Sequence, residues 1–190
     1  MTDTIEIRWH GRGGQGAKTA ALLVADAAIA TGKMAQAFPE YGPERMGAPV
    51  KAFNRISEQE IRVHCAVEHP GIVLVLDETL IDSVNVLEGV PDNGTIIINT
   101  EQKPEDYQKK LNFKGSVFTV NASGIARKNI GLNKPNTPML GALIKATGIL
   151  DYAKMLEDTT HKLQKKFKNK PEVIEGNVKA IQDAYEEVTR

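Results

Sequence analysis

The clearest hydrophobic pattern lies at residues 5–30, where a strand-like segment is followed by glycines and then by a helix-like segment. Ile5, Ile7 and Trp9 alternate with polar residues, which is typical of a strand with one buried face. Residues 11–16 read Gly-Arg-Gly-Gly-Gln-Gly and fit a GxGxxG spacing; the alanine-rich run from Ala17 predicts a helix that closes at Gly32. This order predicts the strand–turn–helix unit that begins nucleotide-binding α/β folds.

Further apolar runs predict a mostly parallel sheet. Residues 72–76, 95–99 and 117–120 are short apolar runs bounded by turn residues, as in strands buried on both faces. Helical patterns alternate with them, so we expect an α/β fold in a single domain over residues 1–190, with a Rossmann-like start and helices on both faces of the sheet. Segments 50–56 and 61–67 both look like strands and predict an added antiparallel hairpin.

Local signals mark where helices begin. Asp77 and Glu78 follow a predicted strand, where ligands of open sheets bind, but they also suit the cap of a helix around residues 80–87, and we favour the cap. Asn121 is expected to cap another helix. A later helix begins near Pro138, and its Gly141 would allow close packing against a neighbouring helix.

The glycine turn is the first candidate binding site. Glycines permit positive φ and close backbone approach, and the first N–H groups of a helix lack internal partners. The backbone of Gly13 to Gly16 therefore suits an anion or the main chain of a partner, with Gln15, Lys18 and Thr19 as further donors. The same residues also fit a tight turn that binds nothing, since a fold and its site are separable.

Composition limits the classes of function. The 190 residues hold 24 Lys and Arg against 24 Asp and Glu, which argues against a nucleic-acid binder driven by bulk charge. No apolar run reaches the roughly 18 residues of a membrane span, and the first residues lack a signal-peptide pattern, so we expect a cytoplasmic protein.

The single cysteine, Cys65, excludes an internal disulfide and a four-cysteine iron–sulfur cluster, and its alternating segment predicts a packed or half-buried thiol. The histidines show no metal-binding spacing, so no metal site is expected.

Two other segments carry contact-capable side chains. Residues 38–49 are rich in Gly and Pro and include aromatic and charged residues, which suits either an interface or an ordered surface loop. Five lysines lie at positions 162, 165, 166, 168 and 170, near the expected end of a helix. The helix dipole favours cations there without any partner, so we expect a solvated face, with a phosphate or acidic-partner contact as the alternative.

Three blocks share an order and spacing more specific than GxGxxG alone: residues 8–18 (Arg-Trp-His-Gly-Arg-Gly-Gly-Gln-Gly-Ala-Lys), 37–45 (Ala-Phe-Pro-Glu-Tyr-Gly-Pro-Glu-Arg) and 136–143 (Asn-Thr-Pro-Met-Leu-Gly-Ala-Leu). Together they resemble the γ subunit of 2-oxoacid:acceptor oxidoreductases, the pyruvate:ferredoxin oxidoreductase (pyruvate synthase) family. The likeness covers nearly the whole chain and includes the continuation at residues 47–49 and 52–55.

The resemblance implies a complex that oxidatively decarboxylates pyruvate or a related 2-oxoacid with coenzyme A, giving an acyl-CoA and CO₂. Electrons would pass to ferredoxin or another acceptor. Thiamine diphosphate, Mg²⁺ and [4Fe–4S] clusters are expected on α, β and δ partner subunits, so this chain alone would hold no cofactor and supply no catalytic residue. The residues expected to hold a coenzyme A phosphate or a partner carboxylate are Gly13, Gly14, Gln15, Gly16, Lys18, Glu44 and Arg45.

Two other readings stay open. A free-standing NAD- or FAD-binding Rossmann protein needs an acidic residue at the end of the second strand; Glu40 is the nearest, although Pro39 precedes it. A non-enzymatic interaction domain is the third reading. Besides pyruvate, branched-chain and aryl 2-oxoacids are alternative substrates of the expected complex.

Overall fold

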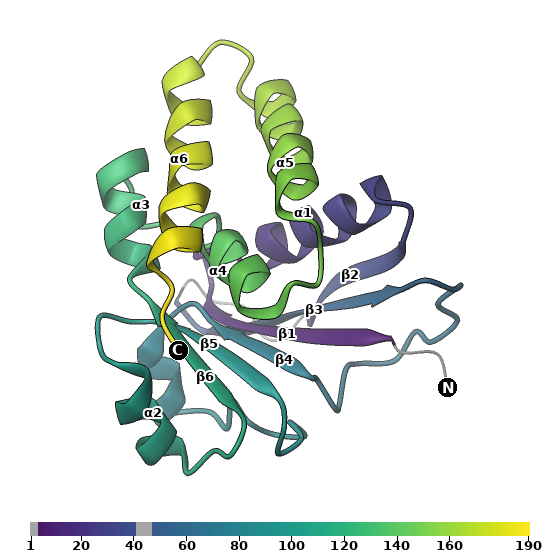
Figure 1. Ribbon diagram of the computed structural model, residues 1–190, viewed down its shortest axis with the longest axis vertical. Helices are drawn as coiled ribbons and strands as arrows, with labels where there is room; N and C mark the ends of the chain where they lie inside the picture. The colour runs from purple at the N-terminus through teal and green to yellow at the C-terminus, as the bar shows by residue number, and fades with distance from the viewer. Residues whose placement is uncertain (1–3, 41–46) are drawn as a thin grey trace.

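A six-stranded sheet organises the computed structural model, which describes residues 4–40 and 47–190 (Figure 1). The strand order is β2-β3-β1-β4-β5-β6. The strands are β1 (Ile5–Arg12), β2 (Met34–Glu40), β3 (Pro49–Ser57), β4 (Ile72–Val75), β5 (Thr95–Asn99) and β6 (Ser116–Val120). Strands β1, β4, β5 and β6 are parallel, whereas β3 runs antiparallel to both β1 and β2. The predicted α/β fold with a mostly parallel sheet is confirmed.

Helices cover both faces of the sheet, but unequally (Figure 1). The helices are α1 (Ala17–Ala30), the 3₁₀-helix η1 (Glu78–Asp82), α2 (Pro104–Leu111), α3 (Ala122–Ile130), α4 (Pro138–Thr147), α5 (Tyr152–Lys166) and α6 (Pro171–Glu187). The larger core lies between the sheet and the layer of α1, α3, α4, α5 and α6, and a smaller one lies under η1 and α2. Because β4 and β5 contribute to both cores, their residues are apolar without alternation.

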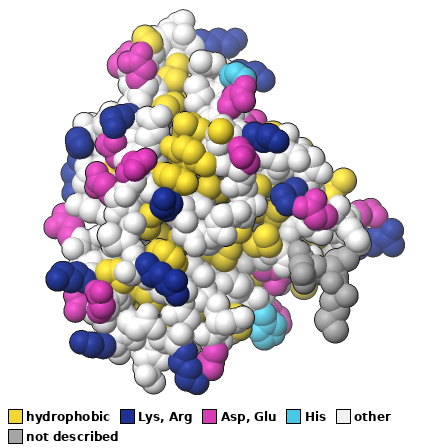
Figure 2. Space-filling model, viewed as in Figure 1, with side chains coloured by type: hydrophobic (Ala, Val, Ile, Leu, Met, Phe, Trp, Pro, Cys, Tyr) yellow, Lys and Arg dark blue, Asp and Glu magenta, His cyan; other side chains and the backbone are white. Residues whose placement is uncertain are grey.

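The outer surface mixes both signs of charge. Figure 2 shows basic and acidic side chains interspersed over one face, with hydrophobic side chains gathered between α5 and α6. The rings of Tyr152 on α5 and Tyr185 on α6 stack with centroids 4.0 Å apart. Among the residues that the structure describes, no helix is long and apolar enough to cross a membrane.

The predicted hairpin is wrong in its second strand. Segment 61–67 forms no strand, and β3 pairs instead with β1 on one side and β2 on the other. Because β3 is paired along both edges, it offers no edge to segment 61–67; the carbonyls of Cys65 (2.9 Å) and Ala66 (3.1 Å) accept instead from the guanidinium of Arg55. The antiparallel strand is thus inserted between β1 and β2 rather than added at an edge.

The expectation of a packed Cys65 thiol is also wrong. Cys65 is exposed, because the alternation of residues 61–67 does not correspond to a strand with one buried face. Of the apolar side chains in this segment only Val67 is buried, and Val63 is about half exposed. Alternation alone therefore misplaced this segment.

The predicted cap residues Asp77 and Asn121 and the predicted glycine after α1 are confirmed. Asp77 caps η1 by accepting from the Thr79 N–H at 3.1 Å, although this helix ends at Asp82 and is shorter than expected. Asn121 caps α3 by accepting from the Gly124 N–H at 2.7 Å. Gly32 follows α1 with φ +87°, as a left-handed residue after a helix should.

Candidate functional site

The turn between β1 and α1 needs its glycines. Gly14 and Gly16 have φ of +96° and +86°, a region that side chains disfavour. A Cβ on Gly16 would also lie 2.8 Å from the side chain of Asn136. The Gly13 N–H donates to Ala48 O at 2.9 Å, so the turn is tied to the chain that leads into β3.

Part of the turn backbone is available to a ligand. The N–H groups of Gly13 and Gln15 are used internally, the latter by Arg12 O at 3.0 Å. Hydrogen bonding of α1 begins with the Ala20 N–H to Gly16 O. Within residues 4–40 and 47–190, the N–H groups of Gly14 and Gly16 find no acceptor. These two groups and the positive end of the α1 dipole suit an anion.

A cavity of about 920 Å³ opens beside this turn. Its walls come from the turn, the start of α1, the loop before α4, the end of α5 and the start of α6. Among the described residues of its lining there is no Asp or Glu, and its cations are Arg12, Lys18, Lys51, Lys134, Lys162, Lys166 and Lys170. Three of the seven pair with carboxylates outside the lining, Arg12 with Asp77, Lys51 with Glu40 and Lys162 with Asp26, so the excess of positive charge is smaller than the number of cations.

The cavity brings together some of the predicted site residues. Gly13, Gly14, Gly16 and Lys18 line it, but Gln15 does not. Glu44 and Arg45 lie outside the residues that the structure describes. Their binding roles stay predictions.

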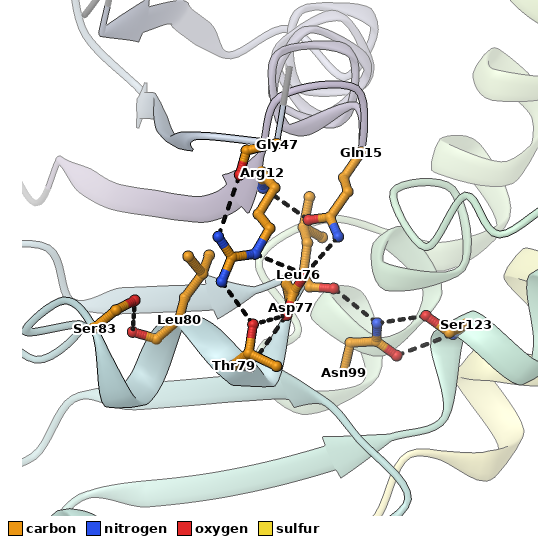
Figure 3. Close-up of polar contacts among 10 residues, drawn as sticks. All are labelled: Arg12, Gln15, Gly47, Leu76, Asp77, Thr79, Leu80, Ser83, Asn99 and Ser123. Atoms are coloured by element: carbon orange, nitrogen blue, oxygen red, sulfur yellow. Dashed lines mark hydrogen bonds and ion pairs between the residues drawn. The ribbon is translucent and has the colours of Figure 1, made fainter. Parts of the chain in front are cut away.

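A network of polar contacts connects the glycine turn with the end of β4 and the start of η1 (Figure 3). The Gln15 amide oxygen accepts from the Arg12 N–H at 2.7 Å, and its amide nitrogen donates to Asp77 Oδ2 at 2.8 Å. Arg12 Nε lies 3.2 Å from the same Oδ2, and Arg12 donates to Thr79 Oγ1 at 2.8 Å. Burial alone would raise the pKa of Asp77, but hydrogen bonds from Thr79 and Gln15 and the charge of Arg12 lower it below its usual value.

This network spans the crevice where an open α/β sheet would bind a dinucleotide. Helix α1 leaves β1 toward one face, and η1 leaves β4 toward the other, so the ends of β1 and β4 form a topological switch point. Arg12 and Asp77 bridge it. Glu40 ends β2, but β3 separates β2 from β1, and the Glu40 carboxylate pairs with Lys51 at 3.6 Å. The geometry therefore disfavours the NAD- or FAD-binding reading.

Comparison with known proteins identifies the family. Residues 6–187 match the family model described as pyruvate ferredoxin/flavodoxin oxidoreductase. The chain belongs to this family. It is 49% identical over 185 residues to the pyruvate synthase subunit PorC of Thermotoga maritima, covering 96% of this chain and 94% of that protein. It is 45% identical to the common γ subunit of the pyruvate/ketoisovalerate oxidoreductases of Thermococcus kodakarensis, covering 95% of each.

The fold agrees with this assignment. The crystal structure of the Thermotoga maritima pyruvate oxidoreductase subunit PORC superposes with a TM-score of 0.85 at 46% identity, covering 98% of this chain and 97% of that one. The chain is therefore a γ-type subunit of a 2-oxoacid ferredoxin oxidoreductase, as the three sequence blocks indicated.

The three blocks of this γ-type subunit meet in space. The glycine turn comes from the first block, the described end of the second contributes Pro39 to the cavity wall, and Asn136 from the third touches Gly16. The sequence predicted one site from residues of the first two blocks, but it did not predict that the third block joins them. The meeting of the three blocks follows from the β1–β3 pairing and from the placement of α4 over the sheet.

The five lysines between positions 162 and 170 divide into two sets. Lys162, Lys166 and Lys170 line the cavity, whereas Lys165 and Lys168 do not. Lys162 is also paired with Asp26 of α1 at 3.1 Å, which joins α5 to α1. Sequence reasoning missed Lys51, Lys134 and Phe167 as members of the same wall, because no local pattern connects them with the glycine turn.

The described part of the chain places no metal centre at the cavity. Across the described ranges, no group of three or more His, Cys, Asp or Glu is placed to hold a metal ion. His10 is buried and accepts from Arg8 Nε at 3.0 Å. Its burial, followed by the charges of Arg8 and Lys51, lowers its pKa to about 3, so it is neutral at physiological pH.

Proposed function

We propose that this γ-type subunit binds coenzyme A in the cavity beside the glycine turn and helps its partners to enclose the reaction of a 2-oxoacid. The observation that carries this proposal is the cavity itself, which combines open backbone N–H groups, seven cations and an apolar wall. Coenzyme A has matching chemistry, because it carries phosphates, a nucleobase and a mostly uncharged arm.

The groups that we propose to bind phosphate lie at the glycine turn. The N–H groups of Gly14 and Gly16 are positioned at the start of a 14-residue helix, where the dipole favours negative charge. Lys18 and Lys51 bring ammonium groups to the same wall. Each charge-assisted hydrogen bond to a phosphate is roughly twice as strong as a neutral one.

Other residues of the lining suit a nucleobase. Phe167, Leu132 and Val173 provide apolar surface in the cavity, and Leu132 is 56% exposed. Lys134, Lys166 and Lys170 also line the cavity. Stacking of a base on an aromatic ring contributes about 1–3 kcal/mol, so Phe167 would add affinity while the lysines pair with a phosphate.

The chemistry is assigned to other chains of the complex. One cysteine cannot hold an iron–sulfur cluster, and the described residues bring no metal-binding group together. We therefore assign thiamine diphosphate, Mg²⁺ and [4Fe–4S] clusters to α-, β- and δ-type partners, in a cytoplasmic complex that passes electrons to ferredoxin or another acceptor. Pyruvate or a branched-chain 2-oxoacid is the substrate that the names of the relatives support, and aryl 2-oxoacids belong to the same chemical class.

Titration calorimetry of the chain with coenzyme A tests the binding site. Lys166→Ala should weaken binding about threefold to tenfold, as expected for loss of one ion pair to a phosphate. The matched control is Lys165→Ala, which removes the neighbouring exposed lysine outside the cavity. Equal affinities for the two variants, or tight binding of NAD or FAD by the wild type, would count against the proposal.

The loop that carries Arg45 gives a second test. Arg45→Ala in the assembled complex should raise the KM for coenzyme A or weaken assembly, because a guanidinium pairs in bidentate fashion with phosphate or carboxylate. Wild-type kinetics together with intact assembly would remove Arg45 from the site.

A further inference from the structure

Asp77 contacts two side chains of the glycine turn, those of Arg12 and Gln15. Asp77 does not line the cavity, but the side chains of Arg12 and Gln15, which contact the turn, both bind its carboxylate (Figure 3). Gln15 donates to its Oδ2 at 2.8 Å, and Arg12 Nε lies 3.2 Å from the same oxygen. The other oxygen, Oδ1, accepts from the N–H and the hydroxyl of Thr79, so η1 fixes the direction of the carboxylate.

Arg12 also contacts a second segment, the residues that lead into β3. Its guanidinium donates to the carbonyl of Gly47 at 3.2 Å as well as to Thr79 at 2.8 Å. Gly47 and Gly13 are also joined by a backbone hydrogen bond of 3.3 Å. The start of β3 and the glycine turn are therefore held by the same side chain, and that side chain is held by Asp77.

We propose that Asp77 is a positioning residue for ligand binding in the cavity. Its carboxylate holds Arg12 and Gln15, and these hold the turn in the one conformation that offers the Gly14 and Gly16 N–H groups to a phosphate. The inference rests on the proposed function, since it assumes that coenzyme A binds beside this turn.

The expected consequence is a change in binding rather than in chemistry. Without the carboxylate, Arg12 loses its ion pair and the Gln15 amide loses its acceptor, so the turn samples further conformations. Restricting the turn to one conformation when coenzyme A binds costs free energy, so the affinity for coenzyme A falls. The proposed function assigns the reacting groups to other subunits, so turnover at saturating coenzyme A should not change.

Steady-state kinetics of the assembled complex provide the test. Asp77→Ala should raise the KM for coenzyme A about fivefold to tenfold and leave kcat and the KM for the 2-oxoacid unchanged. Asp77→Asn should recover part of this loss, because its one amide oxygen can still accept either from Gln15 or from the Thr79 N–H. Asp82→Asn is the matched control, since Asp82 lies on the same 3₁₀-helix and pairs with Lys110 on the surface; it should behave as the wild type.

An unchanged KM for coenzyme A in Asp77→Ala would overturn the inference, as would an equal fall in kcat and in the apparent affinity for the 2-oxoacid. If Asp77→Ala does not fold, Thr79→Val removes the hydroxyl bonded to Arg12 and Asp77 and should raise the same KM severalfold. Calorimetry separates the two proposals. Failure of the wild type to bind coenzyme A defeats the proposed function, whereas equal binding by the wild type and Asp77→Ala defeats only the role of Asp77.

Discussion

His10 shows how a single buried residue responds to pH. It is 2% exposed and accepts a hydrogen bond from Arg8, whose own guanidinium is held by the carbonyls of Val86 and Glu88. Burial lowers the pKa of His10 to about 3 from an ordinary value of 6.5. The neutral form is therefore favoured in the folded state, and its stabilisation is complete above pH 6.5 and is lost as the pH falls toward 3.

We expect the free energy of unfolding to fall by roughly 2 kcal/mol between about pH 7 and pH 4.5 from this residue alone. Urea unfolding at the two pH values measures it. In His10→Gln, whose amide oxygen can accept from Arg8 but does not titrate, the fall should be smaller by that amount. Identical pH dependence of the two proteins would show that His10 is not the group responsible.

At the scale of elements, the contact between α4 and α6 depends on a glycine. A Cβ on Gly141 would lie 2.1 Å from the backbone oxygen of Ile181, so the two helices touch through their main chains. The sequence predicted close packing at this position, and the structure confirms it. Such an approach tolerates no side chain, even though alanine favours helices over glycine by about 1 kcal/mol.

Gly141→Ala should therefore lower the free energy of unfolding by about 1–3 kcal/mol, as overpacking does. Thermal and urea unfolding of the variant measure the change. Gly71→Ala is the control, because a Cβ there meets no atom within 4 Å, and it should stay within about 0.5 kcal/mol of the wild type. Equal stability of the two variants would contradict the packing argument.

For the molecule as a whole, the proposed function assigns coenzyme A binding to this chain and catalysis to its partners. The cavity belongs to this chain, whereas the described residues contain no metal-binding group. We expect the isolated chain to bind coenzyme A without turning over pyruvate, and addition of its partner subunits to restore acetyl-CoA formation. Calorimetry and a coenzyme A-dependent assay on the same preparation measure both properties. Turnover by the isolated chain would contradict this division.

Much of the fold could be predicted, because it follows from local spacing. The alternation of residues 5–9, the glycines after them and the alanine-rich run specify the first unit, and continuous apolar runs specify β4 and β5. The caps at Asp77 and Asn121 are equally local. The family followed from three blocks whose order is itself a sequence property.

Only the tertiary structure decided which distant residues meet. The partner of β3, the exposure of Cys65 and the use of the Gln15 amide by Asp77 each depend on pairing or contact across the chain. The candidate site is divided in the same way, since its glycines were found from the sequence, whereas Lys51 and Phe167 join them only after folding. The physical reason is that spacing along a chain specifies which face of a strand or helix is apolar, but the neighbour of that face is chosen by packing of the whole core.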